Sequence, residues 1–231
     1  MIFEMQSKVT AIILSAGEGS RMGSKERKQF MMLRGMPVLC RTVLAFANSD
    51  SISDIIVVTA PRDIDRTSDM LSFITQKPVR VIAGGASRAE SARLGFSAIS
   101  DDTDFVAIHD GARCLITKED IEAVVNTAKV SGAATAGRVP TDTVKRVNEN
   151  GTVTETLSRD NLFLASTPQV FSRELYAESL KCDTSRDTDD NMQIERIGGR
   201  ITCVTTSARN IKITTPTDLE YAEYLLWREE K

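Results

Sequence analysis

Histidine and paired cysteines are scarce in this chain of 231 residues. Its one histidine, His109, and its four cysteines do not form a zinc-binding pattern: Cys40, Cys114, Cys182 and Cys203 are scattered singly, without a Cys-x-x-Cys pair. We therefore expect no structural zinc and interpret the cysteines as small structural thiols. Cys114 follows a basic residue, so nucleophilic catalysis is a second, less favoured interpretation of that thiol.

The sequence also lacks a charge excess and a long apolar run. Its formal net charge is -3 and its pI is near 5.4, which gives no electrostatic reason to bind nucleic acid. The apolar run at 9–14 is too short to span a bilayer, and residues 1–8 resemble neither a signal nor a transit peptide. We expect a cytoplasmic protein without nucleic-acid or membrane partners.

Apolar runs that end in turns alternate with helical patterns along the chain. The expected strands are 9–14, 55–58, 79–82, 105–108, 201–205 and 210–213. The expected helices begin at Pro37 and cover 87–99, with Ser87 as N-cap, 188–197 and 217–227. This order predicts an α/β fold: one Rossmann-like domain over 1–231, with a twisted, mostly parallel sheet flanked by helices. Ligands bind such sheets at the carboxyl ends of the strands.

Residues 138–160 interrupt this alternation. The segment is polar, contains Pro140, Asn150 and Gly151, and places apolar residues at alternate positions, which predicts an extended hairpin arm. A two-stranded hairpin alone is marginally stable in water. We therefore expect the arm to pack on a second subunit and form a homodimer, with a simple surface excursion as the alternative.

The loop that follows the first expected strand is rich in small residues and contains Arg21, with Lys28 close behind. Backbone N–H groups in such a loop can approach phosphate closely. The loop lacks the Gly-Lys-Ser/Thr of a Walker motif, and Met22 replaces the third glycine of a dinucleotide fingerprint, which disfavours a nicotinamide dehydrogenase. Fixed cations here suit displacement at phosphorus, because negative charge develops on the equatorial oxygens and the leaving pyrophosphate.

Residues 14–23 followed by Lys28-Gln29-Phe30 resemble the signature of nucleotidyltransferases that act on sugar and polyol phosphates. Further segments resemble, in chain order, the methylerythritol phosphate cytidylyltransferases of this family: 84–91, 109–113, 142–145, 167–171, 188–190 and 210–212. The resemblance implies transfer of the cytidylyl group of CTP to 2-C-methyl-D-erythritol 4-phosphate, with release of pyrophosphate, in non-mevalonate isoprenoid synthesis. It also implies Mg2+ or another divalent cation as cofactor.

The resemblance assigns roles residue by residue. The implied catalytic residues are Arg21, Lys28, Arg159 and Lys212. The implied nucleotide-binding residues are Ala16, Gly17, Gly19, Gly84, Gly85, Ser91 and Gly111. The implied substrate-binding residues are Asp110, Arg113, Thr143 and Thr167. Mg2+ would be held mainly by the CTP phosphates, with Asp110 as the protein ligand. Thr143 and Arg159 lie in the arm and would serve the partner's site.

Some of these residues also have a purely structural interpretation. Asp110 follows an apolar strand and precedes a glycine, so it either presents a carboxylate at the sheet edge or bonds its own turn. Lys212 either binds a phosphate or discourages aggregation at an edge strand. His109 is interpreted as orienting its loop, because the attacking phosphate is already anionic and needs no base.

The sequence departs from the family pattern at several positions. Arg27 replaces a usual proline, Ala86 a common acidic residue and Ser158 a usual aspartate. These changes concentrate on the substrate side, so ribitol 5-phosphate stays open as the alternative acceptor. A second alternative is a catalytically silent nucleotide-binding protein of the same fold. The joint presence of the candidate catalytic cations argues against it.

Overall fold

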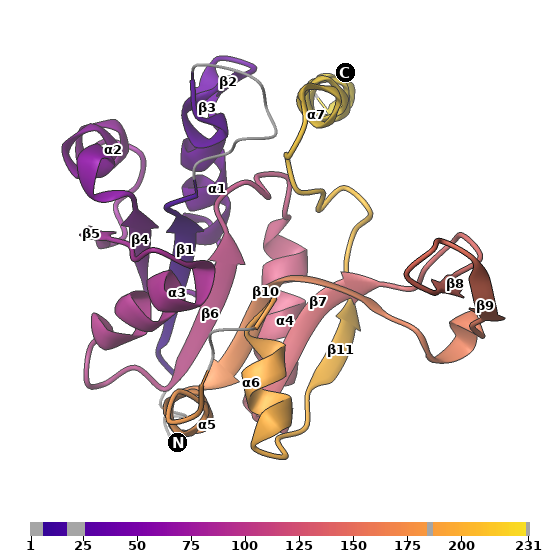
Figure 1. Ribbon diagram of the computed structural model, residues 1–231. Coiled ribbons are helices and arrows are strands. Elements are labelled where there is room, and N and C mark those ends of the chain that lie inside the picture. The colour runs from indigo at the N-terminus through magenta and orange to yellow at the C-terminus, as the bar shows by residue number, and fades with distance from the viewer. Residues whose placement is uncertain (1–6, 18–25, 184–186, 230–231) are drawn as a thin grey trace.

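The computed structural model describes residues 7–17, 26–183 and 187–229 (Figure 1). The strands of the large sheet are β1 (Val9–Ser15), β4 (Asp54–Thr59), β5 (Val79–Ala83), β6 (Phe105–Asp110), β7 (Ala133–Arg138), β10 (Leu164–Ser172) and β11 (Thr202–Thr205). Two small sheets pair β2 (Met32–Leu33) with β3 (Met36–Pro37) and β8 (Lys145–Val147) with β9 (Val153–Thr156).

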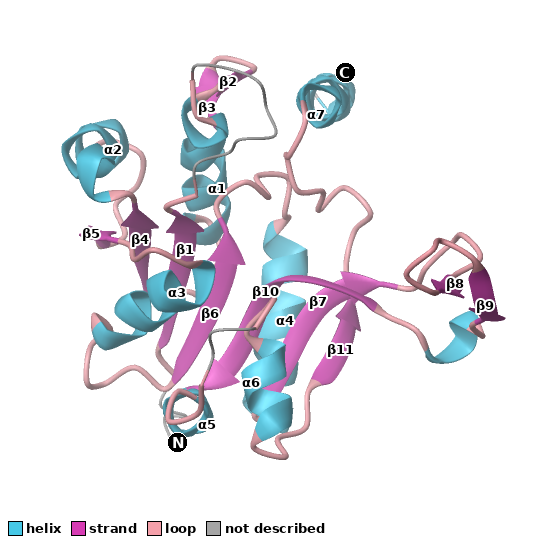
Figure 2. Cartoon of the chain, viewed as in Figure 1, coloured by secondary structure: helices cyan, strands magenta, loops and turns pink. Residues whose placement is uncertain are grey.

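Seven α-helices are found in the described stretches (Figure 2). They are α1 (Val38–Ala47), α2 (Ile64–Leu71), α3 (Arg88–Ser97), α4 (Lys118–Ser131), α5 (Arg173–Ser179), α6 (Asn191–Arg196) and α7 (Pro216–Glu229). Short 3-10 turns are η2 (Lys28–Phe30), η3 (Pro61–Asp63) and η4 (Arg159–Asn161). Across these residues, no helix combines the length and apolarity needed to cross a membrane.

The large sheet has the strand order β11-β7-β10-β6-β1-β4-β5. Strands β6, β1, β4 and β5 are parallel, as the alternation of strands and helices predicts, whereas β10 runs antiparallel to both β6 and β7. The register pairs Leu14 with Asp110 and Ser15 with Thr59. The carboxyl ends of the three central strands therefore meet at one edge of the sheet, and their loops are brought together there.

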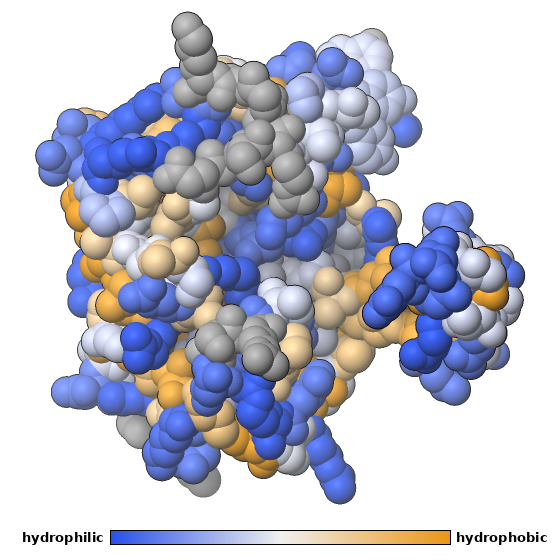
Figure 3. Space-filling model, viewed as in Figure 1, coloured by the Kyte–Doolittle hydropathy of each residue, from blue (hydrophilic) through white to orange (hydrophobic). Residues whose placement is uncertain are grey.

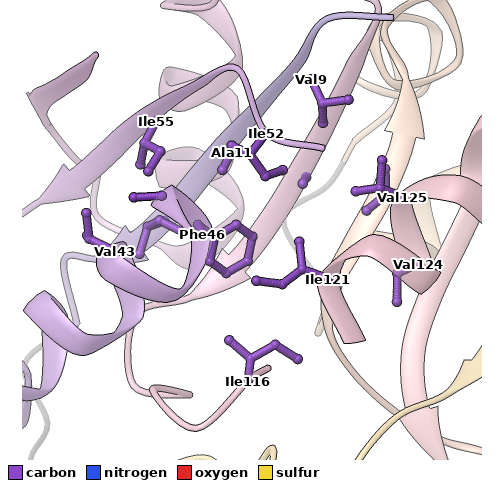
Figure 4. Packing of buried hydrophobic residues seen from close by; sticks show 14 of the residues in the cluster. Val9, Ala11, Val43, Phe46, Ile52, Ile55, Ile116, Ile121, Val124 and Val125 are labelled. Carbon is purple, nitrogen blue, oxygen red and sulfur yellow. The ribbon is translucent and has the colours of Figure 1, made fainter. Parts of the chain in front are cut away.

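Both faces of the sheet are covered: successive side chains of β1 point to opposite faces, and those of Val9–Ile13 are all buried. On one face, β1 packs in a cluster with Phe46 of α1 and Ile121 of α4 (Figure 4). On the other face, Ile12 belongs to a cluster that includes Ala92 of α3 and Tyr176 of α5. The result is a three-layer α/β/α arrangement, which confirms the predicted fold class.

The expected strand at 210–213 is wrong. Its backbone bonds locally, with Asn210 N donating to Ser207 O at 3.1 Å, and Ile213 N donates to Ala112 O at 2.9 Å. Ile213 is fully buried in a small cluster with Leu33 of β2 and Ala222 of α7. This packing holds the segment as an irregular connection, so the interpretation of Lys212 as an edge-strand lysine loses its basis.

The hairpin expected within 138–160 is confirmed. Strands β8 and β9 form a sheet of their own, and every residue of both strands is exposed. The hairpin projects from the body as a separate lobe (Figures 1 and 3). Val147 and Val153 are 53% and 55% exposed, so apolar surface is left uncovered at this hairpin within the chain.

Candidate active site

A cavity of about 300 Å³ lies at the carboxyl edge of the central strands. The residues that line it are Leu14, Ser15, Ala16, Gly17, Lys28, Gln29, Gly85, Ala86, Ser87, Arg88, Ser91, Asp110, Gly111, Ala112, Lys212 and Thr214. They come from the ends of β1 and β6, the turn after β5, the start of α3, η2 and the segment before α7. Figure 3 shows hydrophilic residues around a hollow near the middle of this face.

The turn after β5 is shaped by a glycine that has no room for a side chain. A Cβ at Gly84 would lie 2.7 Å from Ala16 Cβ and 2.9 Å from Ser91 Oγ. Ser91 Oγ accepts from Gly85 N at 3.2 Å and donates to Ser87 O at 2.9 Å, so this hydroxyl holds the turn. The turn thereby brings backbone groups against the end of β1, where a nucleotide can be approached closely.

Lys28 reaches the same cavity from η2. Its Nζ donates to Ile213 O at 3.0 Å. The next residue, Gln29, is 3% exposed, and its Nε2 donates to Ser15 O at 3.0 Å, which ties η2 to the end of β1. Gln29 entered the sequence argument only as part of the signature, because a buried amide has no distinct pattern of its own.

Asp110 lies at the centre of a group of cations. Its carboxylate is 2.8 Å from Lys212 Nζ, 3.4 Å from Arg88 Nε and 3.5 Å from Arg113 Nε. Burial disfavours the ionised carboxyl, but the charges of Arg88, Lys212 and Arg113 outweigh burial and hold the pKa of Asp110 well below its usual value. The carboxylate is therefore ionised at neutral pH and fixes the Lys212 ammonium at the cavity wall.

His109 and Thr167 support this aspartate from behind. Thr167 Oγ1 accepts from Asp110 N at 3.0 Å and lies 3.1 Å from His109 Nδ1, while His109 Nε2 lies 3.2 Å from Arg113 O. The carbonyl requires a donor, so Nε2 carries the proton and Nδ1 accepts from the threonine hydroxyl. Burial lowers the pKa of His109 to about 3, so the ring is neutral and orients the loop, as expected.

This neutral histidine predicts a pH-dependent stability. The folded-state pKa is below the unfolded value of 6.5, so only the unfolded chain takes up this proton between the two values. As pH falls from about 6.5 to 5, the free energy of unfolding should decrease, with a slope approaching about 1.4 kcal/mol per pH unit. Urea unfolding across this range measures the slope, and His109→Gln should abolish it. An unchanged slope in that variant would assign the effect to other groups.

A buried network links the cavity to α6. Arg88 Nη1 donates to Asp190 Oδ2 at 2.6 Å, and Asp190 Oδ1 accepts from Tyr176 OH at 2.8 Å. Asp190 is 1% exposed, so its carboxylate is buried beside its partners Arg88 and Tyr176. Sequence reasoning found the 188–190 segment but assigned it no role, and it missed Arg88, whose partners are distant in sequence.

The structure brings most predicted site residues together. Those that line the cavity are Ala16, Gly17, Lys28, Gly85, Ser91, Asp110, Gly111 and Lys212. Gly84 abuts it, whereas Thr167 is 4% exposed behind Asp110. Thr143 and Arg159 are exposed on the arm, outside this lining. Gly19 and Arg21 lie outside the described residues, so their predicted roles stay predictions.

A second cavity of about 290 Å³ adjoins the first through Lys212. Arg113 and Arg138 also line it, and Arg113 Nη1 donates to Asn210 O at 2.9 Å. Three basic side chains around one small space favour an anionic ligand there. The two cavities together could therefore hold two phosphorylated ligands side by side, with Lys212 between them.

The donor groups favour phosphate over a resident metal. In the stretches that the structure describes, no group of three His, Cys, Asp or Glu side chains is placed to hold a metal ion. Asp110 is the one acidic residue among the described residues that line the first cavity, and it is already paired with cations. Such a site fits a divalent cation that arrives bound to a triphosphate, because Mg2+ is commonly held by substrate phosphates and one or two carboxylates.

The parallel core of the sheet, and the glycine turns and cations gathered at its carboxyl edge, define the chain as an α/β protein of the nucleotidyltransferase class. The model of one protein family matches residues 9–228, and the chain belongs to that family: IspD, 2-C-methyl-D-erythritol 4-phosphate cytidylyltransferase.

Individual relatives agree with this assignment. Proteins named 2-C-methyl-D-erythritol 4-phosphate cytidylyltransferase are similar over nearly the full length. The one from Alkaliphilus oremlandii (strain OhILAs) is 39% identical over 225 residues, which cover 95% of both chains. The one from Syntrophus aciditrophicus (strain SB) is 38% identical over 231 residues, which cover 98% of this chain and 99% of the relative.

Solved structures show the same fold. The 4-diphosphocytidyl-2C-methyl-D-erythritol synthase of Anaerococcus prevotii DSM 20548 superposes with a TM-score of 0.86 at 27% identity, covering 96% of this chain and all of the other. The 2-C-methyl-D-erythritol 4-phosphate cytidylyltransferase of Francisella tularensis gives a TM-score of 0.78 at 29% identity, covering 94% and 99%. The predicted family resemblance is thus confirmed.

Proposed function

We propose that the chain transfers the cytidylyl group of CTP to 2-C-methyl-D-erythritol 4-phosphate, giving the CDP-alcohol and pyrophosphate in the non-mevalonate route to isoprenoid precursors. Family membership over 9–228 supports this activity. The observation that carries it is the cavity itself, because Lys28, Lys212 and Gly85 line one space that suits a nucleotide.

The proposed reaction is an in-line displacement. A phosphate oxygen of the acceptor attacks the α-phosphorus of CTP, a new P–O bond forms, and the bond to the β-phosphate oxygen breaks as pyrophosphate leaves. The acceptor oxygen is already anionic, so no general base is needed. Lys28, with Arg21, stabilises the charge that develops on the α-phosphoryl oxygens and on the leaving group.

The two ligands occupy different parts of the site in this proposal. CTP lies in the first cavity, with its base and ribose against Gly85 and Ser91 and its triphosphate toward Lys28. Asp110 accepts hydrogen bonds from the acceptor's hydroxyls, and Lys212 binds its phosphate. A divalent cation such as Mg2+ would be held mainly by the triphosphate, with Asp110 as the protein residue to ligate it, and would neutralise phosphate charge.

We also propose that the chain is one domain over 1–231 that works as a homodimer through the arm at 138–160. Support comes from the hairpin, whose two strands are exposed throughout and therefore lack the covering that such a ribbon needs. Thr143 and Arg159 would then reach the partner's second cavity, beside Arg113 and Lys212. Both substrates are small, highly charged phosphates, so we place the reaction in the cytoplasm.

Substrate identity is tested by pyrophosphate release. The purified chain is given CTP and Mg2+ with either 2-C-methyl-D-erythritol 4-phosphate or ribitol 5-phosphate, and ATP, GTP and UTP replace CTP as controls. We expect selective turnover of the methylerythritol phosphate with CTP. Preference for ribitol 5-phosphate would keep the mechanism and overturn the acceptor. CTP binding by calorimetry without turnover of either acceptor would instead favour a silent nucleotide-binding protein.

A further inference from the structure

Arg27, the residue before Lys28, is not among the residues that line the cavity, and its side chain contacts the segment between β4 and α2. Its Nη1 donates to Oδ2 of Asp63, which closes η3 at the carboxyl side of β4. The two side chains are only 14% and 11% exposed. An ion pair this enclosed is screened little by solvent, and removing one member leaves the other charge poorly solvated.

Asp63 contacts Arg27 and does not cap the helix that follows it. It occupies the N-cap position of α2, where an aspartate usually accepts from backbone N–H groups of the first helical turn. Its side chain makes no such capping bond. The carboxylate is instead turned toward Arg27, so the pair links the segment that carries Lys28 to α2.

The residues that follow Lys28 are anchored as well. Gln29 Nε2 donates to Ser15 O at 3.0 Å, and Phe30 is 5% exposed beneath the guanidinium of Arg66 of α2, whose Cζ is 4.0 Å from the ring centroid. Phe30 N also donates to Arg27 O at 2.9 Å. Lys28 is therefore placed between two anchored neighbours, one tied to η3 and the other to β1.

From this geometry we infer that Arg27 is a positioning residue for the reaction: paired with Asp63, it fixes the backbone at Lys28 so that the ammonium is aimed at the reacting phosphate. This inference rests on the proposed role of Lys28. Arg27 is not among the residues that line the cavity, so it acts through its neighbour. Small displacements of a charge-stabilising group are costly, because about 1 Å of misplacement can lower a rate on the order of a hundredfold.

The test is a set of double-mutant cycles measured as kcat and KM for both substrates. Arg27→Met and Asp63→Asn should each lower kcat by about tenfold with KM for CTP changed by less than about threefold. The double variant should be no slower than the singles, because either change releases the same anchor. Arg27→Lys should recover part of kcat. Lys181→Gln, which removes the cation of an exposed ion pair with Glu178 just after α5, should leave kcat unchanged.

The decisive cycle combines Arg27→Met with Lys28→Ala. If Arg27 acts through Lys28, it should have no further effect on kcat once the ammonium is gone. The contrary result is that Arg27→Met lowers kcat by the same factor with Lys28 present and with Lys28→Ala, while Lys28→Ala alone is strongly slowed. That result would overturn the positioning role of Arg27 and leave the role of Lys28 standing. Near-normal activity of Lys28→Ala alone would instead remove the proposed role of Lys28. Melting temperatures separate these outcomes from unfolding, since a merely structural pair would lower stability without the dependence on Lys28.

Discussion

Replacing Lys28 with alanine should lower kcat by about a hundredfold to a thousandfold, the range seen when one donor to a charged transition state is lost. The ammonium of Lys28 lines the cavity and is held by Ile213 O at 3.0 Å, so it is in place before substrate binds. Its benefit grows as negative charge moves onto the leaving pyrophosphate. The loss should therefore appear in kcat more than in KM for CTP.

Stability must change little for this result to be informative. Lys28 is half-buried, and truncation removes its hydrogen bond to Ile213 O, worth about 1 kcal/mol, so the melting temperature should fall by only a few degrees. Lys181→Ala removes an exposed lysine in the turn after α5 and serves as the matched control. Turnover by Lys28→Ala at the level of this control would exclude Lys28 from the chemistry.

Mixing two inactive variants should restore activity if the arm serves the partner's site. In a dimer of one Lys28→Ala chain and one Arg159→Ala chain, one site lacks both side chains and the other keeps both. Random exchange of subunits makes half of the dimers mixed, so about a quarter of the wild-type turnover should return. Each variant alone should be slowed by about a hundredfold or more, because each of its sites lacks a phosphate-binding cation.

This prediction rests on the position of Arg159 on the arm. Arg159 is exposed, belongs to η4 at the base of the hairpin, and donates to Thr141 O of the same arm. Light scattering reports whether the two variants still form dimers, and subunit exchange is confirmed with a tagged chain. If mixed dimers form but turnover does not return, Arg159 acts in the site of its own chain or takes no part in the reaction.

The arrangement of the phosphate-binding edge could be predicted from the order of the elements alone. Residues 9–14 and 105–108 are predicted as strands of a mostly parallel sheet, whose carboxyl ends lie at one edge, where ligands bind. The register of Leu14 with Asp110 confirms this expectation. Ser87 was predicted as an N-cap and does accept from Glu90 N at 3.0 Å.

The sequence pattern missed two strands of the large sheet, β7 and β10, and predicted one strand, at 210–213, that does not form. β7 consists largely of alanine and glycine, which carry no β signal, and it forms because β10 and β11 pair with it on both sides. β10 contains Pro168, which argued against a strand, although the ladder tolerates it at an irregular register between Ala165 and Gln169. Residues 210–213 had strand-like composition but are held by Asn210 and Ile213 in other contacts.

The sequence by itself determined the α/β class, the parallel core, the protruding hairpin and the family, because each depends on local periodicity or on motifs in a fixed order. Only the tertiary structure decided which charges meet. Arg88 joins Asp110 to Asp190, and Arg27 joins η2 to Asp63, across separations of 22 to 102 residues. Such pairs leave no periodic trace, since an ion pair requires only that folding bring two side chains within about 4 Å.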